Sequence, residues 1–218
     1  MRFYTNAFVR GSYVYVRGYD YGKRFNEKIF YKPTLFEPTR DKSKYKTITG
    51  HTVKAKKFDS MKSCKEYSEK FKDVTGFSFY GSTMFAYSYL NEKYGNDYDM
   101  DKIRIANIDI EVGSEDGFPE PAEASQPITA ITIKMRNKIY VMGVGAYKND
   151  RDDVYYVDCK TEPKLIEIFL KTWKKLDPDI VTGWNTRYFD MPYIVNRITR
   201  LFGEQKVNEL SPWGIVKQ

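Results

Sequence analysis

The chain has 218 residues, carries 36 Lys and Arg against 29 Asp and Glu for a formal net charge of +7, and is 41% hydrophobic. It is long enough for one large domain or two small ones, each with a buried core. Because it has no apolar run of about 18 residues and no apolar signal core near Met1, we expect neither a membrane span nor export, but a cytoplasmic protein.

Charge and aromatic residues are unevenly distributed along the chain. Residues 1–100 carry 19 Lys and Arg against 11 Asp and Glu, and they hold 13 of the 19 tyrosines. A basic surface with aromatic rings suits single-stranded nucleic acid, because phosphates are attracted and bases can stack. The alternative is that the tyrosines are core residues and the lysines only solubilise the domain.

The first hundred residues are predicted to form a small β-rich α+β domain. Asp59 or Ser60 can cap a first helix that Gly76 stops, and Ser82 can cap a second helix that Gly95 stops. The expected strands are 3–9, 12–17, 25–31 and 77–80, with an edge piece at 34–37, a hairpin at 47–53, and helices at about 60–74 and 82–94. A polar linker at 96–101 gives the domain boundary at about residue 100.

Residues 101–218 are predicted to form a mixed sheet flanked by helices, because strands, a hairpin and helices alternate there. The predicted fold class is therefore α/β (mixed α+β): a small β-rich first domain is followed by a mixed sheet with flanking helices. Pro192 fits only the first turn of a helix, so a helix begins near Phe189 or Asp190. The expected strands are 104–112, 128–135, 138–147, 154–159 and a brief buried strand at 180–182, and the expected helices are 162–176 and 189–202.

Two carboxylates interrupt the apolar strand at 104–112. Residues i and i+2 of a strand point to the same face, so Asp109 and Glu111 project together, opposite Ile108 and Ile110. Like charges this close are costly unless a cation lies between them, and carboxylates are the ligands that Mg²⁺ prefers. The alternative is a half-exposed edge strand with incidental acids. A metal site needs a third carboxylate from elsewhere.

Asp190 is the candidate for that third carboxylate. It follows the strand at 180–182 and opens the helix at 189–202. Asp is also a favoured N-cap residue, so in isolation a purely structural cap is the preferred explanation of Asp190.

Taken together, these stretches resemble a known enzyme family. Asp-x-Glu on a strand and Asn-x-x-x-Phe-Asp at a strand-to-helix junction match the first two motifs of DEDD-type 3′–5′ exonucleases. The longer form, Gly183-Trp-Asn-x-x-x-Phe-Asp-x-Pro-Tyr193, resembles the proofreading exonuclease of family B DNA polymerases. Ile105-Ala-Asn-x-Asp-Ile-Glu, Asp-Gly-Phe-Pro-Glu-Pro121 and Leu210-Ser-Pro212 resemble the polymerases of tailed bacteriophages. The resemblance is specific over 101–218 and fainter over 1–100.

The resemblance implies a ribonuclease-H-like fold for 101–218 and hydrolysis of the terminal phosphodiester of DNA with two Mg²⁺ or Mn²⁺ ions. Asp109 would bridge both ions, Glu111 would hold the ion on the nucleophile side, and Asp190 would hold the other. For a phage-encoded protein, the location would be the host cytoplasm. Phage relatives are also thought to bind RNA through the region that corresponds to 1–100.

The resemblance also implies residues that contact the substrate strand. Asn185 would orient the site or the terminal nucleotide by hydrogen bonding. Phe118 and Phe189 would pack around the last bases of a frayed strand. Phe189 could equally be a core residue.

One part of the family pattern is missing. The family has a fourth carboxylate in a Tyr-x-x-x-Asp motif, which does not occur after residue 193, and Glu204 and Glu209 are poor substitutes. The chain therefore resembles the N-terminal portion of a polymerase, with DNA and the remaining polypeptide as partners. Trp213, Ile215 and Val216 have no obvious core partner within the chain, so we expect them to form an exposed patch or an interface for a second polypeptide.

Three functions remain open from the sequence. The first is a proofreading module that is inactive or weakly active alone. The second is a non-catalytic module for RNA or single strands. The third is a short exonuclease that a partner chain completes.

Overall fold

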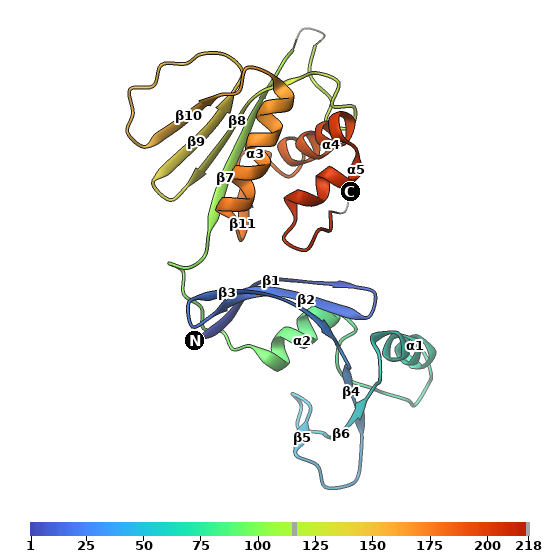
Figure 1. Ribbon diagram of the computed structural model, residues 1–218. Helices are drawn as coiled ribbons and strands as arrows, with labels where there is room; N and C mark the ends of the chain where they lie inside the picture. Colours follow the sequence, from blue (N-terminus) through green and yellow to red (C-terminus); the bar gives the residue numbers. More distant parts are fainter. Residues whose placement is uncertain (115–116, 217–218) are drawn as a thin grey trace. The chain divides into compact units, whose positions relative to one another are not determined.

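The structure is a computed structural model that describes residues 1–114 and 117–216. It divides into two compact units, Met1–Asp99 and Met100–Gln218. Both units combine strands with helices, which confirms the mixed α+β class (Figure 1). None of the helices in the described ranges is both long and apolar enough to cross a membrane.

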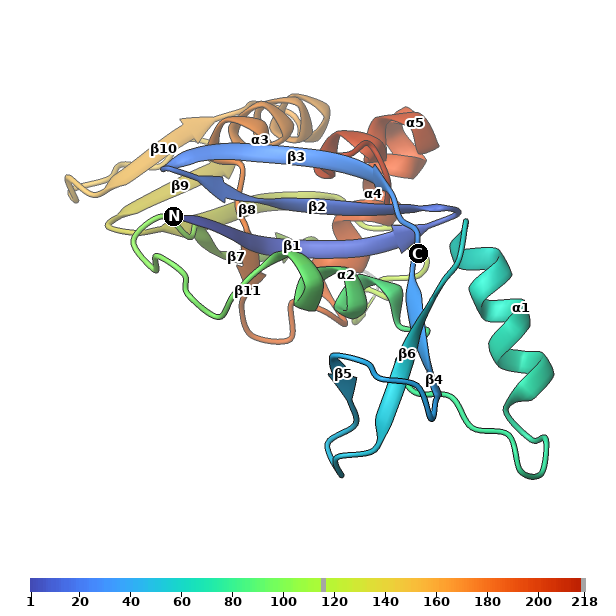
Figure 2. The ribbon, with the colours of Figure 1, turned by 90° about the horizontal axis from the view of Figure 1, so that it is seen from below.

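Unit 1 is built on an antiparallel sheet of the order β1-β2-β3. Its strands are β1 (Arg2–Arg10), β2 (Tyr13–Asp20) and β3 (Lys23–Phe30). Val14 and Val16 of β2 are fully buried, and they share a core with Tyr89 and Leu90 of α2 (Phe85–Lys93). Figure 2 shows α2 lying along this sheet.

A second small sheet in unit 1 has the order β4-β6-β5 and is joined to a helix. Its strands are β4 (Thr34–Pro38), β5 (Tyr45–Lys46) and β6 (Thr52–Lys57). The helix is α1 (Met61–Phe71), and the Ser60 hydroxyl caps it by accepting the Ser63 N–H at 3.1 Å, as predicted.

Three details of unit 1 differ from the prediction. Helix α1 ends at Phe71 instead of residue 74. The expected strand at 77–80 is reduced to a single bridge between Phe36 and Tyr80. Helix α2 begins at Phe85 because the Ser82 hydroxyl accepts the N–H of Met84 in a local turn and does not cap the helix.

Unit 2 contains a five-stranded mixed sheet of the order β10-β9-β8-β7-β11. The antiparallel strands β7, β8 and β9 form its middle, and β10 and β11 add in parallel at the two edges. The bounds are β7 (Ile105–Val112), β8 (Ile128–Met135), β9 (Lys138–Gly143), β10 (Val154–Asp158) and β11 (Ile180–Thr182).

Helices of unit 2 pack on one face of this sheet (Figure 1). They are α3 (Glu162–Leu176), α4 (Asp190–Phe202) and the short α5 (Glu204–Val207), which a 3₁₀ turn at Asn208–Leu210 follows. Ile108 and Ile110 of β7 belong to the same core cluster as Phe169 of α3 and Ile194 of α4. The side chains that alternate with the buried residues of β7 are exposed.

Three expectations for unit 2 were wrong. Strand β9 ends at Gly143, not at residue 147. Strand β11 is exposed, with Ile180 at 43%, because it is an edge strand in the described part of the chain. Trp213, Ile215 and Val216 are half-buried, and Val216 packs against the core, so they do not form an exposed patch.

Both cysteines, Cys64 and Cys159, are free thiols buried in their units. Burial raises the pKa of the Cys64 thiol to about 11, and it also raises the pKa of Cys159. We therefore expect both thiols to react with a disulfide reagent at pH 8 at a small fraction of the rate in urea, because the thiolate is the reactive form. Rapid reaction of either thiol in the native protein, followed by absorbance, would contradict this packing.

Candidate metal and exonuclease site

The first two carboxylates lie on the uncovered face of the unit 2 sheet. Along β7, buried and exposed residues alternate, so Asp109 and Glu111 are exposed while Ile108 and Ile110 are buried. The strand pairs with β8 on one side and β11 on the other. The strand is therefore not at an edge of the sheet, and its two acids lie on one face as their spacing predicts.

Asp190 contacts the same strand, although it lies 80 residues after Ile110 in the sequence. It is the first residue of α4, and its Oδ1 accepts the backbone N–H of Ile110 at 3.0 Å. The residue is only 3% exposed. The N-cap position is Phe189, so Asp190 is not the cap; its carboxylate binds the strand between the two exposed acids.

The charges of the two exposed acids act on Asp190. Burial is the main reason why the pKa of Asp190 is raised, and the charges of Asp109 and Glu111 raise it further. Nevertheless, within residues 1–114 and 117–216 no three His, Cys, Asp or Glu side chains lie close enough together to hold one ion. The charges therefore interact across the site, but the side chains are not gathered into a closed ligand shell.

The junction between β11 and α4 approaches β7 very closely. A Cβ atom built on Gly183 would lie 2.4 Å from the carbonyl oxygen of Ile108. Thr186 is buried, its hydroxyl donates to the same carbonyl at 3.5 Å, and its own carbonyl accepts the Met191 N–H. Thr186 was not predicted from the sequence, because its partner lies 78 residues away.

Asn185 shapes this junction through its backbone. Its φ of +53° is in the left-handed region, which Asn adopts more readily than most residues. Its carbonyl accepts the N–H groups of Tyr188 and Phe189, so it fixes the entry into α4. The side chain is exposed, and its expected role toward a nucleotide stays a prediction.

Two predicted aromatic residues form a pair beside the junction. The ring centroids of Phe118 and Phe189 are 5.6 Å apart. Phe118 is 78% exposed, whereas Phe189 is partly buried against the core, so the core alternative for Phe189 holds in part. Trp184 and Tyr188, at 93% and 72%, are exposed aromatics from the same junction that we had not selected as site residues.

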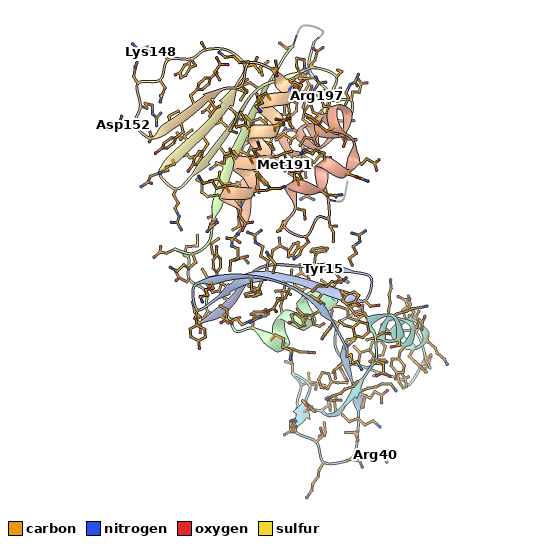
Figure 3. The ribbon with its side chains drawn as sticks, in the orientation of Figure 1. Tyr15, Arg40, Lys148, Asp152, Met191 and Arg197 are labelled. Atoms are coloured by element: carbon orange, nitrogen blue, oxygen red, sulfur yellow. The ribbon has the colours of Figure 1, made fainter. Side chains whose placement is uncertain are left out.

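Helix α4 also holds the loop that leads from β7 to β8, of which residues 115–116 lie outside the described part. Arg197, labelled in Figure 3, donates to both carboxylate oxygens of Glu162 at 2.8 and 2.6 Å. Its Nη1 donates to the carbonyls of Ala124 and Ser125 at 3.0 and 2.8 Å. Tyr193 adds a hydrogen bond to the carbonyl of Gln126. The Phe118 side of the site is thus tied to the helix that carries Asp190.

Comparison with known proteins places this arrangement in a family. Residues 52–218 match the sequence profile of the DNA polymerase family B exonuclease domain. The chain belongs to this family. The match begins inside unit 1, so it includes β6, α1 and α2 as well as unit 2.

Individual polymerases show the same relationship. The chain is 33% identical to the DNA-directed DNA polymerase of Escherichia phage RB69 and 31% identical to that of Enterobacteria phage T4, over 88% and 90% of its length. It is 27% identical to a DNA polymerase of Archaeoglobus fulgidus over 76% of its length. The chain spans about a quarter of the length of the phage polymerases.

Two acids follow α4 in this family B chain, Glu204 and Glu209. Glu209 is paired with Lys174 at 2.8 Å and with Lys206 at 2.7 Å. These lysines lower the pKa of Glu209 and hold it as a structural anion. Glu204 is exposed in the first turn of α5.

The electrostatics of Asp190 lead to a prediction about stability. A raised pKa means that the folded state disfavours the charged carboxylate, so Asp190→Asn should raise the free energy of unfolding in the absence of divalent ions. Asp190→Ala should lower it by about 1–3 kcal/mol, because the Ile110 N–H loses its acceptor. Urea titration of both variants in EDTA tests this opposite sign, and a loss of stability in Asp190→Asn would contradict it.

Proposed function

We propose that unit 2 carries part of the two-metal 3′–5′ exonuclease site of a replicative polymerase that works in the cytoplasm of a phage-infected cell. The observation that carries this proposal is the Asp190 carboxylate bound to the β7 backbone between the exposed Asp109 and Glu111. The substrate would be the 3′ end of a DNA strand.

The three side chains fit a divalent cation in their chemistry. They offer only hard oxygen donors, as Mg²⁺ and Mn²⁺ prefer. The pKa of Asp190 is raised in part by the other two charges, and a bound cation would relieve this repulsion. Asp109, Glu111 and Asp190 would hold the metal, which would activate water and stabilise the departing 3′ oxygen.

The other residues of the junction have supporting roles in this proposal. The Phe118–Phe189 pair would pack against the terminal bases of a frayed strand, since bases stack on aromatic rings. Asn185 would present its exposed amide to the terminal nucleotide. Arg197 would keep the Phe118 loop in place.

The site would be incomplete in this chain. The fourth carboxylate of the family pattern does not occur after residue 193, and the face of the sheet that carries Asp109 and Glu111 is exposed. We propose that the remainder of a polymerase polypeptide covers this face and supplies the missing acid. Alone, the chain would degrade DNA poorly or not at all.

A degradation assay tests this proposal. The 218-residue chain is incubated with a 5′-labelled single-stranded oligonucleotide and Mg²⁺ or Mn²⁺, and a gel follows the shortening of the labelled strand, which reports the release of mononucleotides from its 3′ end. We expect little release, and none from Asp109→Ala. Rapid release that Asp109→Ala abolishes would instead favour a stand-alone exonuclease. Release that persists undiminished in Asp109→Ala and Asp190→Asn would refute the assigned site.

A second proposed function is binding of single-stranded nucleic acid by unit 1. Its β4–β6 region has a strongly basic, exposed surface. On the other sheet of unit 1, the Lys28 ammonium of β3 lies 4.2 Å from the ring centroid of Tyr13, so a cation and an aromatic ring adjoin there as well. The exposed cations of this region are Arg40, Lys42, Lys44, Lys46, Lys54 and Lys57. Filter binding at several salt concentrations tests the proposal, because phosphate contacts require that the affinity for RNA or DNA fall with salt.

A further inference from the structure

A basic pocket lies at the end of the unit 2 sheet where β7 begins. It has a volume of about 520 Å³, within the range of sites that take small ligands. Its lining comes from three places: the residue before β7, the β8–β9 hairpin with the adjoining ends of both strands, and the last turn of α3. The lining residues are Arg104, Met135, Arg136, Asn137, Lys138, Tyr140, Lys175 and Leu176.

Four of these eight residues are cations, and none is an acid. Arg104 Nη1 donates to the carbonyl of Leu176 at 3.1 Å, which neutralises the negative end of α3. In the described part of the chain, this is the only hydrogen bond that the Arg104 side chain donates. Most of its N–H donors therefore remain for an anion. The neighbouring acid Asp179 accepts the backbone N–H of Arg104 at 2.9 Å.

Aromatic rings adjoin the cations. Tyr140 lines the pocket, and its ring is stacked on that of Tyr155 with centroids 5.6 Å apart. The Lys138 ammonium lies 5.2 Å from the Tyr155 ring centroid. Tyr155 is 46% exposed, so the stacked pair offers a planar apolar surface next to positive charge.

We propose that this pocket binds a phosphate group of a nucleotide or of a nucleic-acid strand. Like charges held in one pocket repel each other, and a phosphate relieves this repulsion while accepting several charge-assisted hydrogen bonds. The Arg104 and Arg136 guanidinium groups match the geometry of phosphate oxygens. The Tyr140–Tyr155 pair gives a base or sugar a surface to lie against.

The pocket is separate from the candidate metal site. Arg104 precedes Asp109 by five residues, which is about 17 Å along an extended strand. Arg104 is also directed to the face that α3 covers, whereas Asp109 is on the exposed face. Binding here requires no divalent ion, so it can be tested in EDTA and does not depend on the proposed exonuclease function.

The test is a nuclear magnetic resonance titration of the whole ¹⁵N-labelled chain in EDTA. Inorganic pyrophosphate, dTMP and a short oligo(dT) are added in turn, and the amide shifts of residues 136–140 and 176 are followed. Lys138→Gln combined with Lys175→Gln should lower the fitted affinity at least about tenfold, the loss expected from even one of the two charge-assisted hydrogen bonds. Lys164→Gln combined with Lys171→Gln removes the same charge from exposed positions of α3 outside the pocket and should leave the affinity within about twofold.

Each outcome distinguishes a source of the phosphate or overturns the proposal. Saturable shifts with pyrophosphate or dTMP identify a free phosphate or nucleotide as a sufficient ligand. Shifts with oligo(dT) alone identify the backbone of a strand. The proposal is overturned if none of the three probes shifts these amides, or if both double variants lose affinity equally.

Discussion

Replacing Arg197 with Met should lower the free energy of unfolding of unit 2 by about 3–5 kcal/mol, the cost of removing one partner from a buried ion pair. Arg197 and Glu162 have side chains that are each 10% exposed, and their groups are 2.6 Å apart. Within residues 1–114 and 117–216, the substitution leaves the buried Glu162 carboxylate with the Ile128 N–H as its remaining partner, and it removes a donor from the carbonyls of Ala124 and Ser125. Such a loss is a large part of the stability of a small domain.

The measurement is urea unfolding followed by tryptophan fluorescence. All three tryptophans lie in unit 2, so this signal follows unit 2 and not unit 1. Arg200→Ala is the matched control, because Arg200 is an exposed arginine of the same helix with a single 3.5 Å contact to the Glu123 carbonyl. It should cost less than about 0.5 kcal/mol. Equal, small losses in both variants would show that the buried pair does not hold the loop.

Gly183→Ala should lower the unfolding free energy of unit 2 by roughly 2–3 kcal/mol through overpacking. The added methyl would lie 2.4 Å from the Ile108 carbonyl oxygen and 2.1 Å from the Thr186 hydroxyl. The first of these is backbone in a central strand and cannot move aside cheaply. The substitution should therefore push the β11–α4 junction, and Asp190 with it, away from β7.

Gly113→Ala is the control for this prediction. Its added methyl would meet Pro127 at 3.4 Å, an ordinary van der Waals contact, so the cost should stay within about 0.5 kcal/mol. The two variants are compared by the same fluorescence titration. Equal stability of Gly183→Ala and Gly113→Ala would contradict the close contact between the β11–α4 junction and the β7 backbone.

The parts of unit 2 that were predicted well are those in which local pattern and tertiary packing agree. Strand β8 and helix α3 have the predicted bounds, because a run of β-branched residues and a helical apolar stripe each bury one continuous face. The strand that carries Asp109 and Glu111 was also predicted correctly. Their i, i+2 spacing therefore predicted that both side chains lie on one face.

The rest depended on partners far away in the sequence. Asp190 was open to interpretation as a helix cap, because local preference does not reveal that the carboxylate binds Ile110, 80 residues away. Arg197 was not selected from the sequence, yet it binds two segments that lie 35 and 73 residues away. The Ser82 cap failed because the hydroxyl closes a turn just before the helix.

The most direct test of the proposed metal site is Mn²⁺ binding to the 218-residue chain, followed by the loss of the free-ion signal in electron paramagnetic resonance. We predict that the chain binds at most one ion, weakly, and that Asp109→Asn, Glu111→Gln and Asp190→Asn each lower this affinity about tenfold or more, the loss of one charged ligand. Asp152→Asn, on an exposed loop labelled in Figure 3, should leave it unchanged. Equal affinity in all four variants and the parent chain would contradict the assignment of these carboxylates to one metal site.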